Sequence, residues 1–263
     1  WITKEVASNL NGDTLSKLML GGIPAIRLKN FLDEGLLKFY KKEVESYHFK
    51  PSYEASKNKF LGPHISTFFT ETGDGIDALI DHVKEVSEKS TYPKSVIQLI
   101  HLVIGFISEQ TNRSIRFLEL EGNKLWSGSA AFRNITAATP VHYDSFKDNQ
   151  INIFDHLEVE GEASCLLHIY CPPNTGGETN IYDLLHDPTH KDDEYYKNNG
   201  GFYYSDELVK DADQIVLTPE EGSLTLFPMF KYHSINGTTN NNRISLAFFM
   251  VKLVGDDTIY VYN

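Results

Sequence analysis

Residues 140–144 read Pro-Val-His-Tyr-Asp and place an imidazole, His142, two positions before a carboxylate, Asp144. On an extended strand, residues two apart point to the same face, so both side chains can reach one point. A third metal ligand has to come from a distant part of the chain, and His233 supplies it. Two histidines and one carboxylate leave three positions of an octahedron open, which is typical of oxygen-activating non-haem Fe(II).

A possible carboxylate anchor follows the last of these ligands. Arg243 comes ten residues after His233, and Ser245 shares a strand face with Arg243 by the same alternation. A guanidinium fork with a hydroxyl beside it is suited to hold a carboxylate through paired hydrogen bonds. The combination of a metal triad and a carboxylate anchor is far more specific than either part alone.

The pattern His142-x-Asp144, His233, Arg243-x-Ser245 resembles the iron(II)- and 2-oxoglutarate-dependent oxygenases. A narrower resemblance, over most of the chain, is to the carrier-independent alkaloid halogenases of the hapalindole and welwitindolinone type. Those halogenases carry Gly at the position of the carboxylate, whereas this chain carries Asp144. The segments that carry the narrower resemblance are Gly-Ile-Pro-Ala-Ile-Arg (22–27), Thr-Pro-Val-His (139–142) and Pro-Pro-Asn-Thr-Gly-Gly-Glu-Thr (172–179).

The resemblance implies Fe(II) on the triad, 2-oxoglutarate with its distal carboxylate on Arg243 and Ser245, and O2 as the oxidant. Succinate and CO2 are then the co-products. In the halogenases chloride takes the coordination position that Asp144 fills here, so we expect hydroxylation of an unactivated C–H bond. The expected substrate is a free small molecule, a natural-product intermediate. Desaturation or cyclisation on the same iron is the alternative reaction.

Further co-substrate contacts are expected on two strands. In residues 164–171, alternation places His168 and Tyr170 on one face. If that face lines a barrel, His168 contacts the co-substrate; otherwise it is an ordinary hydrogen-bonded strand residue. Arg133 and Asn134 precede the first ligand by about nine residues on an adjacent predicted strand, and one of them is a further candidate.

A substrate pocket is expected where Gly62-Pro63 interrupts an aromatic-rich run. In the halogenases the similar stretch lines the pocket. The alternative is a hydrophobic loop packed on the core. The resemblance therefore implies substrate contacts from Phe60, His64, Ile65 and Phe68.

The hydrophobic rhythm changes near residue 114. Helical patterns occupy 13–21, 36–47 (with Asp33 as N-cap), 75–89 and 94–110. Short runs separated by turn residues then predict strands at 114–120, 128–137, 151–157, 163–171, 178–182, 202–204, 213–217, 223–227 and 243–251.

The predicted fold class is α+β, mainly β, in one oxygenase domain, 1–263. Residues 1–113 form a mostly helical support with the substrate-pocket loop. Residues 114–263 form the core, with an acidic insertion at about 183–200 that is either a lid or a solvated loop. The family resemblance implies that this core is a double-stranded β-helix, a jelly-roll or cupin-like barrel, with the helical portion packed on it.

His186 and His190 are a rival metal pair, because their spacing is that of zinc-binding helices. Pro188 lies between them and disfavours a shared helical face. Two other functions compete with the 2-oxoglutarate oxygenase: a non-catalytic cupin-like metal-binding protein, and an iron oxygenase that uses no 2-oxoglutarate. Arg243 argues against both, since neither needs a buried carboxylate anchor.

Composition and charge limit the partners and the cellular setting that we expect. A net charge of −12 disfavours nucleic acid and anionic membrane surfaces. Two cysteines, Cys165 and Cys171, are too few for a disulfide framework. Without a signal-peptide pattern or an apolar run of about eighteen residues, we expect a cytoplasmic protein with a small-molecule substrate. The sequence does not reveal the oligomeric state.

Overall fold

The computed structural model describes residues 1–51, 58–61, 93–120, 123–124, 131–145, 157–198, 202–239 and 243–262. The predicted helix 75–89 and nearly all of the predicted strand 151–157 lie outside these ranges. The described helices are α1 (Gly12–Met19), α2 (Glu34–Glu45), α5 (Lys94–Thr111) and α6 (Glu194–Asn198), with short 3-10 helices at Pro188–Asp192 and Asp206–Val209. The chain is mainly β, as predicted.

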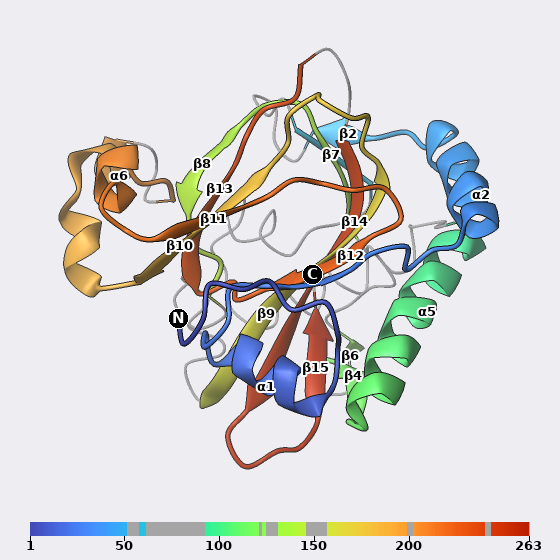
Figure 1. Ribbon diagram of the computed structural model, residues 1–263, viewed down its shortest axis with the longest axis horizontal. Coiled ribbons are helices and arrows are strands. Elements are labelled where there is room, and N and C mark those ends of the chain that lie inside the picture. The colour runs from blue at the N-terminus through green and yellow to red at the C-terminus, as the bar shows by residue number, and fades with distance from the viewer. Residues whose placement is uncertain are drawn as a thin grey trace.

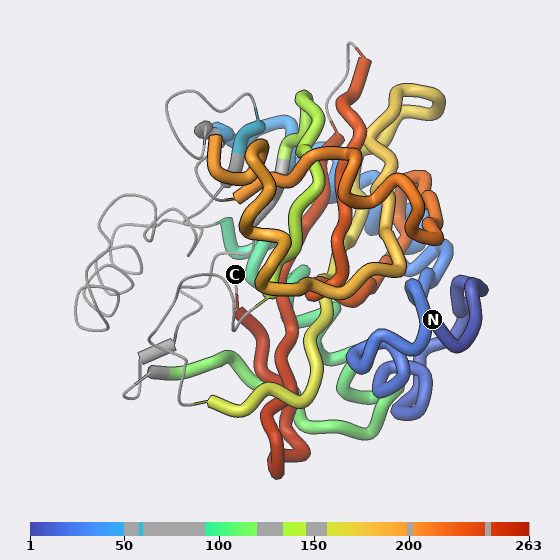
Figure 2. The backbone as a smooth tube through the Cα atoms, turned by 90° about the vertical axis from the view of Figure 1, so that its left-hand side faces the viewer, coloured from blue at the N-terminus to red at the C-terminus, as the bar shows by residue number. Residues whose placement is uncertain are grey.

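A large sheet forms the centre of the molecule, and its long strands β9 and β14 lie side by side (Figures 1 and 2). In the described residues it runs in the order β1-β12-β9-β14-β7-β3-β2. In addition, β15 pairs with β14, and β4 pairs with β15. Its strands are β1 (Ile26–Leu28), β2 (Lys50–Pro51), β3 (Lys59–Leu61), β4 (Ile115–Phe117), β7 (Ala131–Ile135), β9 (Val159–Tyr170), β12 (Leu224–Phe227), β14 (Arg243–Leu253) and β15 (Ile259–Tyr262).

A second sheet has the order β11-β10-β13-β8. Along the chain, β7, β9, β12 and β14 belong to the large sheet, whereas β8, β10, β11 and β13 belong to the second. The second sheet consists of β8 (Thr139–His142), β10 (Thr179–Leu185), β11 (Gln214–Leu217) and β13 (Lys231–Ile235); a separate hairpin pairs β5 (Glu119–Leu120) with β6 (Asn123–Lys124).

The two sheets pack face to face. Leu166 of β9 and Ala247 of β14 share an apolar cluster with Ile181 of β10 and Leu217 of β11. Residues directly opposite one another on paired strands point to the same side of a sheet. Even-numbered residues of β9 and odd-numbered residues of β14 therefore line the space between the sheets near this cluster.

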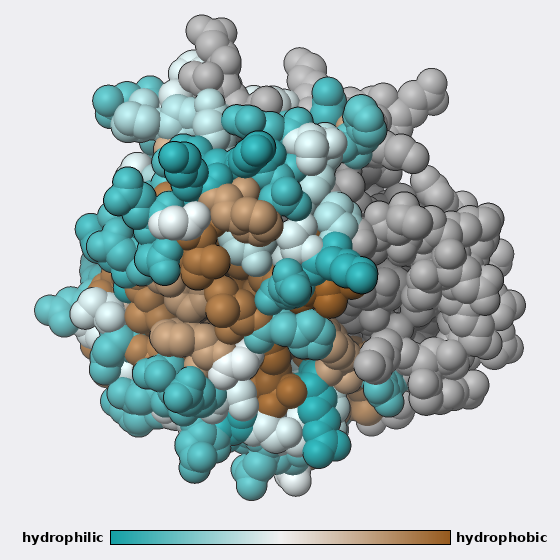
Figure 3. Space-filling model, turned by 90° about the vertical axis from the view of Figure 1, so that its right-hand side faces the viewer, coloured by the Kyte–Doolittle hydropathy of each residue, from teal (hydrophilic) through white to brown (hydrophobic). Residues whose placement is uncertain are grey.

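The other face of the large sheet is covered by helices. Cys165 and Leu167 of β9 belong to one buried cluster with apolar residues of α1, α2 and α5. Figure 1 shows α2 and α5 on one side of the molecule and α6 on the other. The α2 and α5 side carries an apolar surface area (Figure 3), and the exposed apolar residues of these two helices are Leu36, Phe39, Ile97 and Leu102. No described helix is long and apolar enough to cross a membrane.

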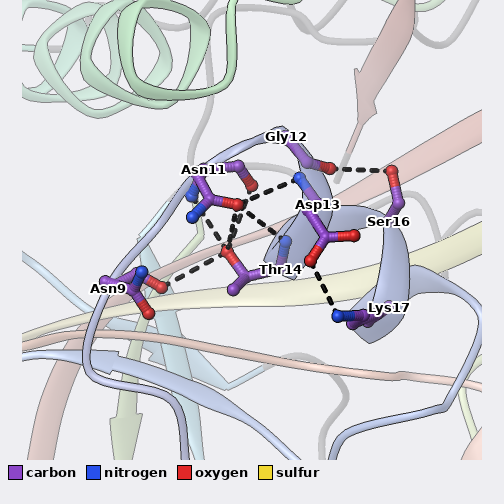
Figure 4. A network of polar contacts seen from close by, with 7 residues as sticks. All are labelled: Asn9, Asn11, Gly12, Asp13, Thr14, Ser16 and Lys17. Carbon is purple, nitrogen blue, oxygen red and sulfur yellow. Dashed lines mark hydrogen bonds and ion pairs between the residues drawn. The ribbon is translucent and has the colours of Figure 1, made fainter.

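The start of α1 is fixed by a capping box (Figure 4). The Asn11 side chain accepts hydrogen bonds from the N–H groups of Asp13 and Thr14, and the Thr14 hydroxyl accepts one from the Asn11 N–H. The helix then lies close against β9. A Cβ on Gly161 would lie 2.7 Å from the Met19 carbonyl oxygen, so only glycine allows this approach.

Several predicted elements are confirmed, and others need correction. Asp33 caps α2, since its carboxylate accepts from the Leu36 N–H at 2.8 Å. The predicted strand 114–120 is broken at Leu118 into β4 and β5. The run 202–204 forms only an isolated bridge between Tyr204 and Val141. The sequence analysis missed β15, which pairs with β14 and β4 at the edge of the core.

Candidate metal centre and anion pocket

The three predicted metal ligands meet at one point. His142 on β8 lies directly opposite His233 on β13. Asp144 follows the end of β8 rather than lying on the strand, as the alternation argument assumed, and its N–H donates to the Met229 carbonyl at 2.9 Å. The ligand atoms lie within 4.8 Å of one another, and in the described part of the chain no other group of three such side chains has this geometry.

Each imidazole is held in a metal-binding orientation by its own strand. Nδ1 of His142 is 2.7 Å from the Pro140 carbonyl oxygen, and Nδ1 of His233 is 3.0 Å from the Lys231 carbonyl oxygen. A proton on Nδ1 donates to these carbonyls and leaves Nε2 as the lone-pair donor. The Nε2 atoms of His142 and His233 lie 3.8 and 3.3 Å from Asp144 Oδ2.

The triad faces the large sheet. His233 lies opposite Ile181, whose side chain belongs to the cluster between the sheets. The His233 ring is 5.1 Å from that of Phe227, at the end of β12 in the large sheet. Both imidazoles are almost fully buried, and the Asp144 side chain is 13% exposed. The donor set fits a divalent transition metal with open coordination positions.

Arg243 and Ser245 lie on the large sheet, on the face that points toward the triad. Arg243 is buried, and its Nη1 donates a hydrogen bond to the Gly177 carbonyl. Gly177 has a φ of +82°, and a Cβ on it would lie 2.9 Å from Arg243 Cδ. A larger residue would therefore displace the guanidinium, so Gly177 leaves the room that the Arg243 side chain occupies.

His168 extends this polar patch. It lies on β9 directly opposite Ser245 and is buried. Within the part of the chain that the structure describes, neither His168 Nδ1 nor the Ser245 hydroxyl has a hydrogen-bond partner. Burial, then Arg243, then Arg27 lower the pKa of His168 well below its usual value, so the imidazole is neutral near pH 7. A guanidinium, a hydroxyl and a neutral imidazole together form a site for a carboxylate.

Two features of the predicted co-substrate strands need correction. Tyr170 does not share the face of His168: it packs against the cluster under the helices, with Lys41 of α2 5.2 Å from its ring centroid. A register shift between Ile244 and Ser245 breaks the alternation there. Arg133 lies on β7, which pairs with β14 and β3 and not with the ligand strand β8.

The backbone of Arg133 is opposite both Ser245 and Phe60. Asn134 points to the opposite side of the sheet, since it pairs with Ile244 of the helix-side cluster. Of the predicted substrate contacts, Phe60 lies on β3, whereas His64, Ile65 and Phe68 fall outside the described residues.

Sequence reasoning missed two aromatic residues beside the triad. The ring of Phe202 stacks on His142 with a centroid distance of 6.1 Å, and the ring of Tyr203 lies edge-on at 6.1 Å. Tyr204 anchors this segment, since its N–H donates to the Val141 carbonyl at 2.8 Å. Phe202 remains 41% exposed although it lies beside a buried metal ligand. The only sequence signal was a cluster of aromatics in 202–204.

His186 and His190 meet on the outer side of the second sheet, where both Nδ1 atoms contact the Tyr232 hydroxyl, at 3.0 and 2.9 Å. One hydroxyl can donate to one imidazole and accept from the other. Pro188 begins a 3-10 helix, so the two histidines share no α-helical face. Tyr143 stacks on His186 at 4.2 Å, which makes this an aromatic cluster behind the metal ligands.

The described part of the acidic insertion packs on this outer side. Tyr196 stacks on Tyr204 at 4.6 Å, and the Ser205 hydroxyl donates to Asp193 at 2.8 Å. Burial raises the pKa of Tyr204 to about 12 and raises that of Tyr232 as well, so both hydroxyls stay protonated. The role of the insertion as a lid stays a prediction.

No protein-family model and no curated protein matches the chain. A novel N-substituted L-amino acid dioxygenase from Burkholderia ambifaria AMMD has a similar structure, with a TM-score of 0.61 at 14% identity over 96% of this chain and 91% of that one. Its complex with alpha-ketoglutarate gives 0.59 at 14% identity over 95% and 90%. The alpha ketoglutarate dependent carbocyclase SnoK from nogalamycin biosynthesis gives 0.49 at 9% identity over 95% and 87%. The chain therefore has the fold of the dioxygenase.

Proposed function

We propose that the chain is an Fe(II)- and 2-oxoglutarate-dependent oxygenase that hydroxylates an unactivated C–H bond of a free small molecule. The observation that carries this proposal is that the candidate metal ligands and the candidate carboxylate anchor belong to opposite sides of the space between two facing sheets. His142, Asp144 and His233 point from the second sheet toward Arg243, Ser245 and His168 on the large sheet. A metal centre opposite a buried carboxylate site suits a co-substrate that chelates iron and carries a second carboxylate.

The strand order supports a double-stranded β-helix as the core. Successive strands from β7 to β14 are divided between the sheets as β12-β9-β14-β7 and β11-β10-β13-β8. This is the two-sheet arrangement of a jelly roll, in which neighbouring strands of one sheet are distant in sequence. Triad and anchor then occupy the interior of one barrel.

Within this site, His142, Asp144 and His233 would hold Fe(II), and Arg243 with Ser245 would hold the distal carboxylate of 2-oxoglutarate. The metal, the co-substrate and O2 supply the oxidising power, with succinate and CO2 as co-products. The neutral His168 can donate a hydrogen bond to the same carboxylate without adding a charge. Because Arg243 is buried, water would be excluded from an ion pair between its guanidinium and the distal carboxylate. Their attraction would therefore be stronger than at the protein surface.

Asp144 supports hydroxylation over halogenation, because its carboxylate lies close to both imidazoles, where it can complete the triad. A substrate that approaches the metal would pack against Phe202 and Tyr203, the aromatic rings beside His142. The proposed substrate is therefore a small molecule with an apolar face, such as a natural-product intermediate. Since the dioxygenase of similar fold is named for N-substituted L-amino acids, such compounds are sensible first members of a substrate panel.

The test is product analysis with Fe(II), 2-oxoglutarate and O2. We expect slow formation of succinate without substrate, and faster formation, with one hydroxylated product per succinate, when a panel compound fits. His142→Ala should abolish succinate formation, whereas Lys197→Ala, at an exposed ion pair of the insertion, should not change it. A folded, iron-loaded wild-type protein that forms no succinate would contradict the proposal. It would leave the non-catalytic metal-binding protein as the better account.

A further inference from the structure

The polar surface of the large sheet continues beyond Ser245 and His168. Thr225 on β12 lies directly opposite Leu166 on β9 and opposite Arg27 on β1. Leu166 and His168 are two residues apart on one strand and therefore share a face. Ser245, His168, Thr225 and Arg27 thus all lie on the side of the sheet that faces the second sheet, across four strands.

All four side chains contain buried polar atoms that have no hydrogen-bond partner among the described residues: Ser245 Oγ, His168 Nδ1, Thr225 Oγ1, and Nε and Nη2 of Arg27. Buried polar groups in native proteins are almost always hydrogen-bonded, since an unsatisfied one costs free energy. One unsatisfied atom is unremarkable in a protein of this size. Several of them on one side of a sheet, on four neighbouring strands, indicate a polar ligand at this face.

The charged side chains near these four residues indicate the charge of that ligand. Arg27 and Arg243 both act on the imidazole of His168 and lower its pKa, so both guanidiniums lie near this one residue. Two strand spacings, about 10 Å, separate β1 from β9, and a long arginine side chain can cover most of that distance. Among the described residues, Glu220 is the anion that acts on Arg27, and it also forms an ion pair with Lys29 at 3.3 Å. Counted over the residues that the structure describes, the cationic side chains beside His168 therefore favour an anionic ligand.

We propose that Arg27 and Thr225 extend the carboxylate site formed by Arg243, Ser245 and His168, and that they bind the distal carboxylate of the 2-oxo acid co-substrate from the side opposite Arg243. This inference rests on the proposed function, since it assumes a dicarboxylate chelated at the triad. The carboxylate then lies over His168 between two guanidiniums. Its oxygens can accept hydrogen bonds from Arg27 and the Thr225 hydroxyl on one side and from Arg243 and Ser245 on the other.

Two cations around one carboxylate predict selectivity for dicarboxylates. A 2-oxo acid without the distal carboxylate, such as 2-oxobutyrate, can chelate the metal but cannot use the two guanidiniums. Removal of Arg27 should therefore weaken binding of 2-oxoglutarate and leave binding of 2-oxobutyrate unchanged. A purely structural role of Arg27 would weaken both compounds alike, through a loosened barrel.

The experiment is an anaerobic titration of the Fe(II)-loaded protein with each compound, followed by visible absorption. Arg27→Gln should raise the Kd of 2-oxoglutarate roughly tenfold or more, as expected for loss of a charged hydrogen bond. Arg27→Lys should restore part of the affinity. Thr225→Val, which keeps the side-chain shape and removes the hydroxyl, should raise the Kd by a smaller factor. Lys4→Gln, which removes a cation from an exposed ion pair with Asp213, is the control and should not change the Kd.

The outcomes separate this inference from the proposed function. If Arg243→Gln weakens 2-oxoglutarate binding while Arg27→Gln and Thr225→Val bind it like wild type, Arg27 lies outside the pocket and only the inference fails. If wild type binds neither compound, the proposed function fails first. If Arg27→Gln does not fold, Arg27→Lys and Thr225→Val decide, and equal loss of both compounds in these variants also overturns the inference.

Discussion

At the scale of single residues, the proposed hydroxylation depends on Asp144. It lies 3.3 Å from the Nε2 atom of one triad imidazole and 3.8 Å from that of the other. Asp144→Gly would open a further coordination position and create the pattern of the alkaloid halogenases. We expect hydroxylation to fall by roughly 100-fold or more, since even indirect partners of metal ligands contribute about 10–100-fold. Some chloride transfer should appear when chloride is present.

The measurement is product analysis of wild type and variant with an accepted substrate, in buffers with and without chloride. Asp192→Gly removes an exposed carboxylate outside the site and should behave like wild type. Normal hydroxylation by Asp144→Gly would mean that Asp144 is not a ligand. A chlorinated product from wild type would contradict the assignment of the native reaction.

Residue types and spacing were sufficient to predict the centre of the site. The three predicted metal ligands lie within 4.8 Å of one another, although Asp144 follows the end of β8 and does not lie on the strand. The role of Arg243 and Ser245 as a carboxylate anchor stays a prediction. Tyr170 was placed on the wrong face because a register shift near the end of β9 is not visible in a single sequence. Arg27 and Thr225 were not singled out because their place on the same side of the sheet as His168 depends on which strands pair.

At the scale of elements, the connection between β9 and β10 determines where Arg243 lies. Gly177 has a left-handed backbone and leaves no room for a Cβ beside Arg243 Cδ. Gly177→Ala should therefore push the guanidinium out of place and raise the Kd of 2-oxoglutarate roughly tenfold, while Fe(II) binding stays unchanged. The Kd can be measured by anaerobic titration.

Gly105→Ala is the matched control for this substitution, because a Cβ at that position in α5 meets nothing within 4 Å. Alanine also favours a helix over glycine, so this variant should be as stable as wild type or slightly more stable. If Gly177→Ala binds 2-oxoglutarate as tightly as Gly105→Ala, the glycine does not position the anchor.

Local signals predicted the helices better than the sheets. The N-cap of α2 and the length of α5 were readable because helix periodicity and capping are local. The strand β15 was missed because its partners are β14 and the distant β4. The segment 202–204 was assigned as a strand, but its aromatic rings lie beside His142. The place of Phe202 and Tyr203 beside His142 depends on where the chain comes back to β8 after the acidic insertion. No local sequence pattern reveals that position.

At the scale of the whole molecule, each of the two sheets contributes a different part of the candidate site. The second sheet carries the triad, and the large sheet carries the buried guanidinium, hydroxyl and imidazole. Helices cover the other face of the large sheet, whereas Arg243, Ser245 and His168 lie on the face toward the second sheet. The narrower resemblance to the alkaloid halogenases stays a prediction, because the similar folds establish the architecture and not the branch.

The central claim is that the triad and the anchor bind one molecule of 2-oxoglutarate between them. Anaerobic visible absorption of the Fe(II)-loaded protein, before and after addition of 2-oxoglutarate, tests it without knowledge of the substrate. We predict a new metal-to-ligand charge-transfer band that is absent in His233→Ala and needs a higher concentration of 2-oxoglutarate in Arg243→Ala. If the folded, iron-loaded wild-type protein gives no band, 2-oxoglutarate does not bind at this metal and the account is contradicted.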